Sequence, residues 1–303
     1  MDFGRIEHIE QVDFSLPPDH KGLAKVLGGQ RAASPRVHVG GVLWASDSFP
    51  GTIYPAKARP ADFVRYYTQQ FNTIELNATH YKIPSAETLK RWYAIAPVGF
   101  KFCPKVHQSV SHAGYLGDMV AYQNECNQGF ALLQEKLGPV FMQLPPQFAP
   151  GRLQELILFL EAAAMPGMAV ELRHPAWFLN EGPLNTLCNY LYKKGLGLVL
   201  TDTPGRRDVL HMRLTNKTAF IRFNGHNNFA GDQPRIDAWI ERAHTWLEQG
   251  LEELYFFVHT PGQLFMPGLV SYFIERLAAV CGIALPAPVF QPRQGEPPPL
   301  LNA

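Results

Sequence analysis

The sequence predicts an α/β fold, a closed (β/α)₈ barrel of the TIM type formed by a single domain. Short runs of β-branched and aromatic residues alternate with longer segments of helical period along most of the chain. Eight such runs occur, and the chain between successive runs is long enough for a crossover helix. An open doubly wound sheet would be favoured by a glycine-rich phosphate loop, but "GGVLWASDSFPG" lacks the GxGxxG spacing.

Eight strands are predicted from these runs. They span residues 38–44, 72–77, 100–105, 139–144, 168–173, 196–202, 218–224 and 254–259. In the first strand, the pair Gly40 and Gly41 is interpreted as a tight place where backbones approach closely, since glycine has no Cβ.

Helices are predicted between the strands, and the connection after residue 202 is expected to be irregular. The helices span residues 60–70, 85–96, 118–136, 151–163, 181–194, 234–249 and 263–281, with a short one near 20–27. Ser85 and Asp118 precede two of these segments and are predicted N-caps. Gly138 and Gly195 stand where helix ends favour a left-handed residue.

Three parts of the chain differ in composition. Residues 1–36 are polar and interrupted by Pro and Gly, which predicts an irregular N-terminal extension. Residues 37–285 carry the alternating pattern and are expected to form the barrel domain. Residues 286–303 contain six prolines in eighteen positions, which predicts an extended tail.

Charge and cysteine usage restrict the classes of function. With 27 basic and 26 acidic residues, the chain carries no broad cationic surface, so a nucleic-acid partner is not expected. The four cysteines form no CxxC pair and are interpreted as reduced thiols of a cytoplasmic protein. The N-terminus lacks an apolar signal core, and no apolar window is long enough for a membrane span. No cofactor or metal is expected, and the oligomeric state is left open.

Strand alternation predicts which side chains point into the barrel. Large apolar residues should face the helices, so Ile74 and Leu76 point outward and Glu75 and Asn77 point inward. The same rule assigns to the interior Lys101, Cys103, Lys105, Phe141, Gln143, Ala169, Glu171, Arg173, Phe220, Arg222, Asn224, Tyr255, Phe257 and His259.

Most of the inward polar residues lie at the C-terminal ends of their strands, where barrel enzymes build their sites. Glu171, Glu75 and Lys105 are the candidate catalytic residues. Two carboxylates can divide general acid and base roles when their pKa values differ. Lys105 could form a Schiff base or act as an electrophile if burial lowers its pKa.

The candidate binding residues point to an anionic small-molecule ligand. Arg173 and Arg222 can grip a carboxylate or phosphate in bidentate fashion, and we expect an anion between them. Asp202 is expected at the same rim, and Trp44 and Trp177 follow strand ends and could form a pocket wall. The remaining candidates are His174, Asn77, Gln143, Tyr81, Asn224 and His259.

Each candidate has a structural alternative. Glu171 and Arg173 could be an ion pair that joins strands, and His174 could hold the loop before Pro175. His38 and His211 are interpreted as core histidines whose hydrogen bonds are satisfied.

Five segments together resemble the YecE-like family, a domain of unknown function numbered 72. They are "FNTIELNATHYKIPSAETLKRW", "GFKFCPK", "LGPVFMQLPPQF", "AVELRHPAWF" and "FIRFNG", within residues 37–282. The resemblance implies a TIM-barrel-like fold and a pocket, but no reaction. The chain differs from the family pattern at His80, where the family has phenylalanine, and at His259 and Thr260, where it has paired asparagines.

Three functions are compatible with the sequence. The first is an enzyme for a sugar phosphate or organic acid, and a hydrolase and an isomerase or lyase fit equally well. The second is a metal-dependent barrel of the endonuclease or sugar-isomerase kind, but three nearby cations would oppose a metal ion. Its ligands would come from Glu75, Glu171, Asp202, His174 and His259. The third is a non-catalytic binding module whose tail docks a partner.

Overall fold

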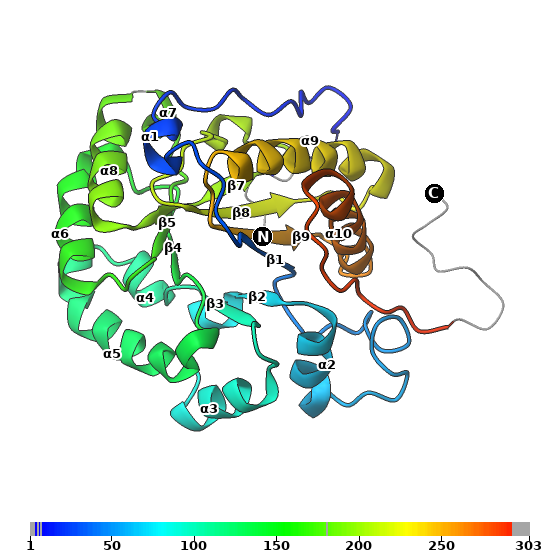
Figure 1. Ribbon diagram of the computed structural model, residues 1–303. Helices are drawn as coiled ribbons and strands as arrows, with labels where there is room; N and C mark the ends of the chain where they lie inside the picture. The colour runs from blue at the N-terminus through cyan, green and yellow to red at the C-terminus, as the bar shows by residue number, and fades with distance from the viewer. Residues whose placement is uncertain (1–3, 5, 7, 180, 293–303) are drawn as a thin grey trace.

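The computed structural model describes residues 4, 6, 8–179 and 181–292 and shows a mixed α/β fold in which helices pack around parallel strands (Figure 1). Every predicted strand overlaps an observed one, and the segment 196–202 holds two strands that break at Val199. The strands are β1 (Arg36–Gly40), β2 (Thr73–Leu76), β3 (Lys101–Pro104), β4 (Phe141–Gln143), β5 (Ala169–Glu171), β6 (Gly197–Leu198), β7 (Leu200–Asp202), β8 (Thr218–Asn224) and β9 (Glu253–His259).

The helices follow the predicted segments, with two short additional helices, α4 and α7, after β3 and β5. The α-helices are α1 (Leu23–Leu27), α2 (Phe63–Gln70), α3 (Ala86–Ile95), α4 (Gln108–Ser111), α5 (Val120–Phe130), α6 (Leu153–Ala163), α7 (Ala176–Leu179), α8 (Glu181–Lys194), α9 (Phe229–Glu248) and α10 (Met266–Cys281). The 3₁₀ helices are η1 (Pro60–Asp62), η2 (Asn77–His80), η3 (Leu116–Met119), η4 (Ala131–Lys136), η5 (Pro150–Arg152) and η6 (Arg207–Val209).

The strands form three parallel sheets, with the orders β1-β9-β8-β7, β2-β3 and β4-β5-β6. A few isolated backbone hydrogen bonds connect neighbouring sheets, for example from Glu75 N to Gly41 O and from Val106 N to Phe141 O. Within the described residues the ladders do not join, so the predicted closed barrel is not confirmed. Pro104 ends β3 without a backbone N–H, which removes one donor at the junction with β4.

The interior and exterior faces of the strands follow the alternation rule. One buried cluster, enclosed by the strands, consists of Cys103, Phe141, Ala169, Val199, Phe220, Tyr255 and Phe257. Six of these seven residues were predicted to point inward. The tight place in β1 is also confirmed, because a Cβ on Gly40 would lie 2.1 Å from the carbonyl oxygen of Thr73.

The predicted helix ends are confirmed in part. Ser85 caps α3 by accepting a hydrogen bond from Thr88 N at 3.2 Å, and Gly195 has a φ of 67°. Asp118 was wrongly predicted as an N-cap, because the chain is already helical from Leu116 in η3. Gly138 is not left-handed either; its backbone instead approaches β3, where a Cβ would lie 2.6 Å from Cys103 Sγ.

Both ends of the described chain contact the domain. Gly4 accepts a hydrogen bond from Gly205 N, and the start of the Pro-rich segment is held by bonds from Val289 N to Gln70 and from Gln291 N to Thr52. Residues 293–303 of the predicted tail lie outside the described residues.

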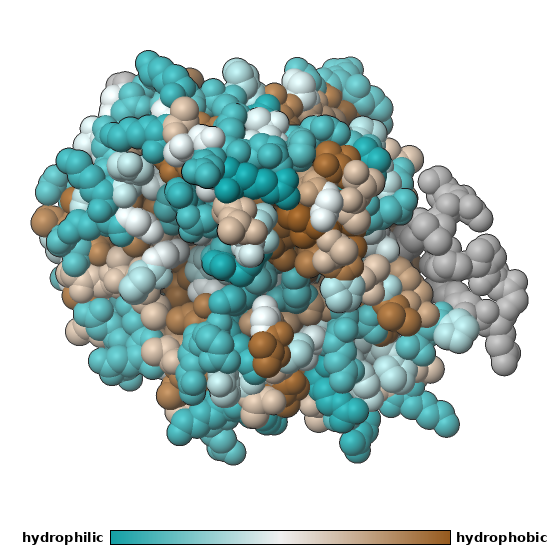
Figure 2. Space-filling model, in the orientation of Figure 1, coloured by the Kyte–Doolittle hydropathy of each residue, from teal (hydrophilic) through white to brown (hydrophobic). Residues whose placement is uncertain are grey.

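Hydrophilic side chains cover most of the face seen in Figure 2, with apolar side chains gathered in smaller patches. Among the helices that the structure describes, none is long and apolar enough to cross a membrane.

Candidate functional site

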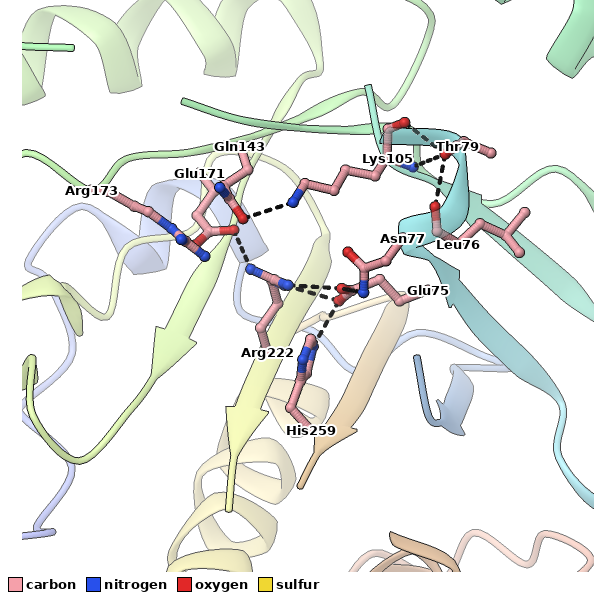
Figure 3. A network of polar contacts seen from close by, with 10 residues as sticks. All are labelled: Glu75, Leu76, Asn77, Thr79, Lys105, Gln143, Glu171, Arg173, Arg222 and His259. Atoms are coloured by element: carbon pink, nitrogen blue, oxygen red, sulfur yellow. Dashed lines mark hydrogen bonds and ion pairs between the residues drawn. The ribbon is translucent and has the colours of Figure 1, made fainter. Parts of the chain in front are cut away.

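Arg222 of β8 is the centre of a buried charge cluster at the C-terminal ends of the strands (Figure 3). Its Nε and Nη2 donate to the two carboxylate oxygens of Glu75 at 2.9 and 2.8 Å. Its Nη1 donates to Glu171 Oε2 at 2.6 Å. One guanidinium therefore joins carboxylates from β2 and β5, and it uses the planar donor geometry that arginine provides.

Further side chains extend the cluster on both sides. Arg173 Nε donates to Glu171 Oε1 at 2.9 Å, so Glu171 lies between two guanidiniums. Glu75 accepts from Asn77 Nδ2 at 2.8 Å and contacts His259 Nε2 at 3.1 Å. An anionic ligand was expected between Arg173 and Arg222, but the Glu171 carboxylate occupies that position.

The arginines keep both carboxylates ionised. Burial would raise the pKa of Glu171, but Arg173 and Arg222 outweigh it and lower the pKa to about 2. Burial acts in the same sense on Glu75, where Arg222 and His259 hold the pKa well below its usual value. A carboxyl group that is ionised at neutral pH cannot donate a proton. The geometry therefore does not favour a division of acid and base roles between Glu75 and Glu171.

Lys105 lies at the end of β3 and differs from the arginines. Its backbone is fixed by Thr79, whose hydroxyl accepts from Lys105 N at 2.9 Å and donates to Lys105 O at 2.7 Å. The ammonium is buried and donates to the neutral Gln143 Oε1 at 3.0 Å. Within the described part of the chain, Nζ makes no ion pair with a carboxylate. Burial and Arg222 lower the pKa of Lys105 to about 8.

The charged residues around Arg222, which we call the inner cluster, include more positive than negative side chains. The inner cluster consists of Glu75, Lys105, Glu171, Arg173 and Arg222. Two carboxylates face three cations, so the inner cluster has one excess positive charge. The excess falls on Lys105, because each arginine is paired with a carboxylate.

Asp202 does not belong to the inner cluster, contrary to expectation. Its carboxylate accepts from Trp239 Nε1 at 2.8 Å and pairs with Arg235 Nη2 at 2.9 Å, both on α9, and with Arg207 of η6. The reason is that residues two positions apart on a strand face the same side, and Asp202 follows the outward-facing Leu200 by two positions. A second group, which we call the outer cluster, is thus formed by Asp202, Arg207, Asp232 and Arg235.

Two other candidates also serve the local structure. Trp177 is fully buried in the hydrophobic core, where its indole donates to Phe148 O at 2.8 Å, so it does not form a pocket wall. His174 Nδ1 accepts from Ala176 N at 3.1 Å and holds the turn into α7. His211 has hydrogen-bond partners, whereas His38 is buried and its ring nitrogens make no hydrogen bond among the described residues, although Nε2 lies 4.0 Å from Glu253 Oε1.

A cavity of about 1230 Å³ opens beside the inner cluster. Its walls come from the ends of β1, β2, β7, β8 and β9 and include five of the predicted residues, namely Trp44, Asn77, Tyr81, Asn224 and His259. Asn77 and His259 also contact Glu75, so they connect the cavity to the inner cluster. Sequence reasoning missed four polar residues in the loops after β8 and β9, although their position after inward-facing strand ends was a usable signal. They are His226, Asn227, Thr260 and Gln263.

The residues proposed as metal ligands are not gathered in one place. Glu75 and Glu171 are bonded to Arg222, and Asp202 lies on the opposite face of its strand. Among the described residues, no group of three or more His, Cys, Asp or Glu side chains could hold a metal ion.

Comparison with known proteins places the chain in a family. A family model described as "Protein of unknown function DUF72" matches residues 38–292. The chain belongs to the DUF72 family. The YecE protein of Escherichia coli K12 is 28% identical over 232 residues, which cover 70% of this chain and 84% of YecE. The YunF protein of Bacillus subtilis is 26% identical over 194 residues, which cover 58% of this chain and 66% of YunF.

Solved DUF72 structures share the fold. A DUF72 family protein from Enterococcus faecalis V583 aligns with a TM-score of 0.59 at 16% identity, covering 84% of this chain and all of that one. A DUF72 family protein from Thermotoga maritima MSB8 aligns with a TM-score of 0.52 at 23% identity, covering 74% and 92% of the two chains.

Proposed function

We propose that the protein is an enzyme that acts on a small anionic substrate, and that the Lys105 ammonium binds the anion and donates a proton during the reaction. The observation that carries this proposal is the excess positive charge of the inner cluster at Lys105. A buried ammonium that has only a neutral amide partner lacks the counter-charge that burial demands. A substrate carboxylate or phosphate supplies that charge.

The pKa values support one reaction class over another. Glu75 and Glu171 are ionised and bound to arginines, which disfavours hydrolysis by a carboxylate acid and base. The pKa of Lys105 is about 8, so its ammonium can donate a proton close to neutral pH. An isomerase or lyase of a sugar phosphate or organic acid therefore fits better than a hydrolase.

The location of the site supports a barrel as the scaffold. We infer that the three sheets together act as a TIM-type barrel with interrupted ladders, because the polar residues converge at the C-terminal strand ends where such barrels bind substrates. The four cysteines are free, as expected in the cytoplasm, where we propose that the protein works.

A thermal-shift screen tests the role of Lys105. Phosphate, sulfate, citrate and sugar phosphates are compared with chloride at constant ionic strength. A ligand at about 100 times its Kd adds about 2.7 kcal/mol to the free energy of unfolding, which corresponds to a Tm increase of roughly 5 °C for a chain of this size. Lys105→Met should lose the increase. Lys101→Met is the matched control, because that ammonium lies at the opposite end of β3 and donates to Glu135 O. Equal shifts in wild type and Lys105→Met would refute the proposal.

A further inference from the structure

The cavity beside the inner cluster differs from it in charge. None of the described residues that line the cavity is Lys, Arg, Asp or Glu. A charged group placed there would lose hydration without gaining a counter-charge. The cavity is therefore suited to an uncharged part of a ligand, while the inner cluster takes the charged part.

Apart from the imidazoles of His226 and His259, the polar side chains of the cavity are mainly amides and hydroxyls. They are Asn77, Thr203, Asn224, Asn227, Thr260 and Gln263. An amide offers both donors and acceptors, and a hydroxyl is a donor and an acceptor at once. This set matches a ligand whose own polar groups both donate and accept, which is the property of alcohol groups.

Three of these side chains carry a buried polar atom without a partner. Asn77 Oδ1, Thr260 Oγ1 and Gln263 Oε1 make no hydrogen bond within the part of the chain that the structure describes. An unpaired buried polar atom is a cost that folded proteins generally avoid. Three of the side chains that line the cavity therefore have spare hydrogen-bonding capacity for ligand groups.

Aromatic side chains add flat apolar surfaces at the same cavity. Tyr81 is 67% exposed, and Trp44 packs edge-on against Trp92 with ring centroids 4.9 Å apart. Aromatic faces bind apolar surfaces while polar groups at their edges stay hydrated. A sugar ring presents such an arrangement, with C–H groups on its faces and hydroxyls around its rim.

We propose that this cavity binds an uncharged glycosyl ring of the substrate whose anionic group lies beside Lys105. Only the position of the anionic group beside Lys105 rests on the proposed function; the glycosyl subsite does not. Asn77 and His259 lie between the two parts, since both line the cavity and contact Glu75. The volume of about 1230 Å³ exceeds the usual range of roughly 300–1000 Å³ for small-ligand pockets, so a ring with large substituents fits.

Saturation-transfer NMR with neutral probes tests the glycosyl subsite. Glucose, xylose, N-acetylglucosamine and maltose are compared with adenine and uracil at millimolar concentration. At least one saccharide should receive magnetisation from the wild-type protein. If no saccharide does so, or if adenine or uracil binds and the saccharides do not, the proposal is overturned.

Two threonines provide a matched pair of variants. Thr260 and Thr201 each carry a buried hydroxyl unpaired among the described residues, but only Thr260 is among the lining residues of the cavity. Neither Thr260→Val nor Thr201→Val should lower Tm, because neither breaks a hydrogen bond within the described chain. Thr260→Val should weaken saccharide binding about three- to tenfold, the range expected for one hydrogen bond. Equal losses of affinity in the two variants would contradict the assignment.

A second pair tests the aromatic surface. Tyr81→Ala should reduce saccharide affinity, whereas Tyr115→Ala should not, although Tyr115 is also 51% exposed. Lys105→Met separates the two proposals: it should abolish phosphate binding and leave neutral saccharide binding unchanged. Saccharide binding without any phosphate binding in wild type would overturn the proposed function and retain the glycosyl subsite.

Discussion

The inner and outer clusters lie on opposite sides of the sheet that contains β7 and β8, and they differ in charge balance. Arg222 points to the interior, while the next residue, Phe223, points outward and packs under the guanidinium of Arg235 at 4.3 Å. The outer cluster pairs two aspartates with two arginines. The inner cluster has two glutamates for three cations. A balanced cluster fits a structural role, whereas an excess charge at a strand end fits a ligand-binding role.

The largest loss of stability is expected when the central arginine of either cluster is replaced, and the two clusters should respond alike. Arg222→Met leaves Glu75 and Glu171 without their shared partner, and Arg235→Met does the same to Asp202 and Asp232. Each variant should lose about 3–5 kcal/mol of unfolding free energy, because a buried charge remains uncompensated. Urea denaturation measures the loss. A loss below about 1 kcal/mol in either variant would mean that its cluster is hydrated.

Removal of a second cation from each cluster should distinguish the two clusters. Lys105→Met removes the excess charge and should change the unfolding free energy by less than about 1 kcal/mol, or increase it. Arg207→Met removes a guanidinium that bonds to Asp202 and to Ser15 O, and should cost about 1–3 kcal/mol. The same denaturation experiment applies. A larger loss for Lys105→Met than for Arg207→Met would reverse the comparison.

The pH dependence of stability should show the excess charge directly. The pKa of Lys105 falls from an ordinary 10.5 to about 8 in the folded protein. Between these values the unfolded chain binds a proton that the folded protein does not, so stability rises with pH by about 1 kcal/mol per unit from this group. Other groups titrate in the same range, so the quantity to measure is the difference between wild type and Lys105→Met. A difference that stays constant between pH 8 and 10 would contradict the assignment.

Much of the site could be predicted from the sequence because strand alternation is a local property. The apolar neighbours of Glu75, Glu171 and Arg222 assigned them to the interior, and the structure agrees. Their pairing could not be predicted, since alternation gives the face of a side chain but not its partner across the fold. The same rule applied to 196–202 would have placed Asp202 outside, in phase with Leu200.

The remaining differences depend on packing between distant segments. Gly138 fitted the pattern of a helix end, but its conformation is decided by the approach of its backbone to Cys103. Trp177 follows a strand end, yet it is buried because the short helix α7 turns it onto Phe148 O. The gaps between the three sheets could not be predicted either. The sequence pattern indicates where strands form, but not whether neighbouring strands pair along their full length.

The central claim is that Lys105 carries an uncompensated charge that an anionic ligand neutralises. ¹⁵N NMR of the lysine ammonium groups, with Lys105→Met to assign the signal, measures its pKa with and without phosphate. We expect titration near pH 8 in the free protein. Phosphate should raise the pKa, because a nearby anion favours the charged form. A pKa near 10.5 that does not respond to phosphate would contradict the account.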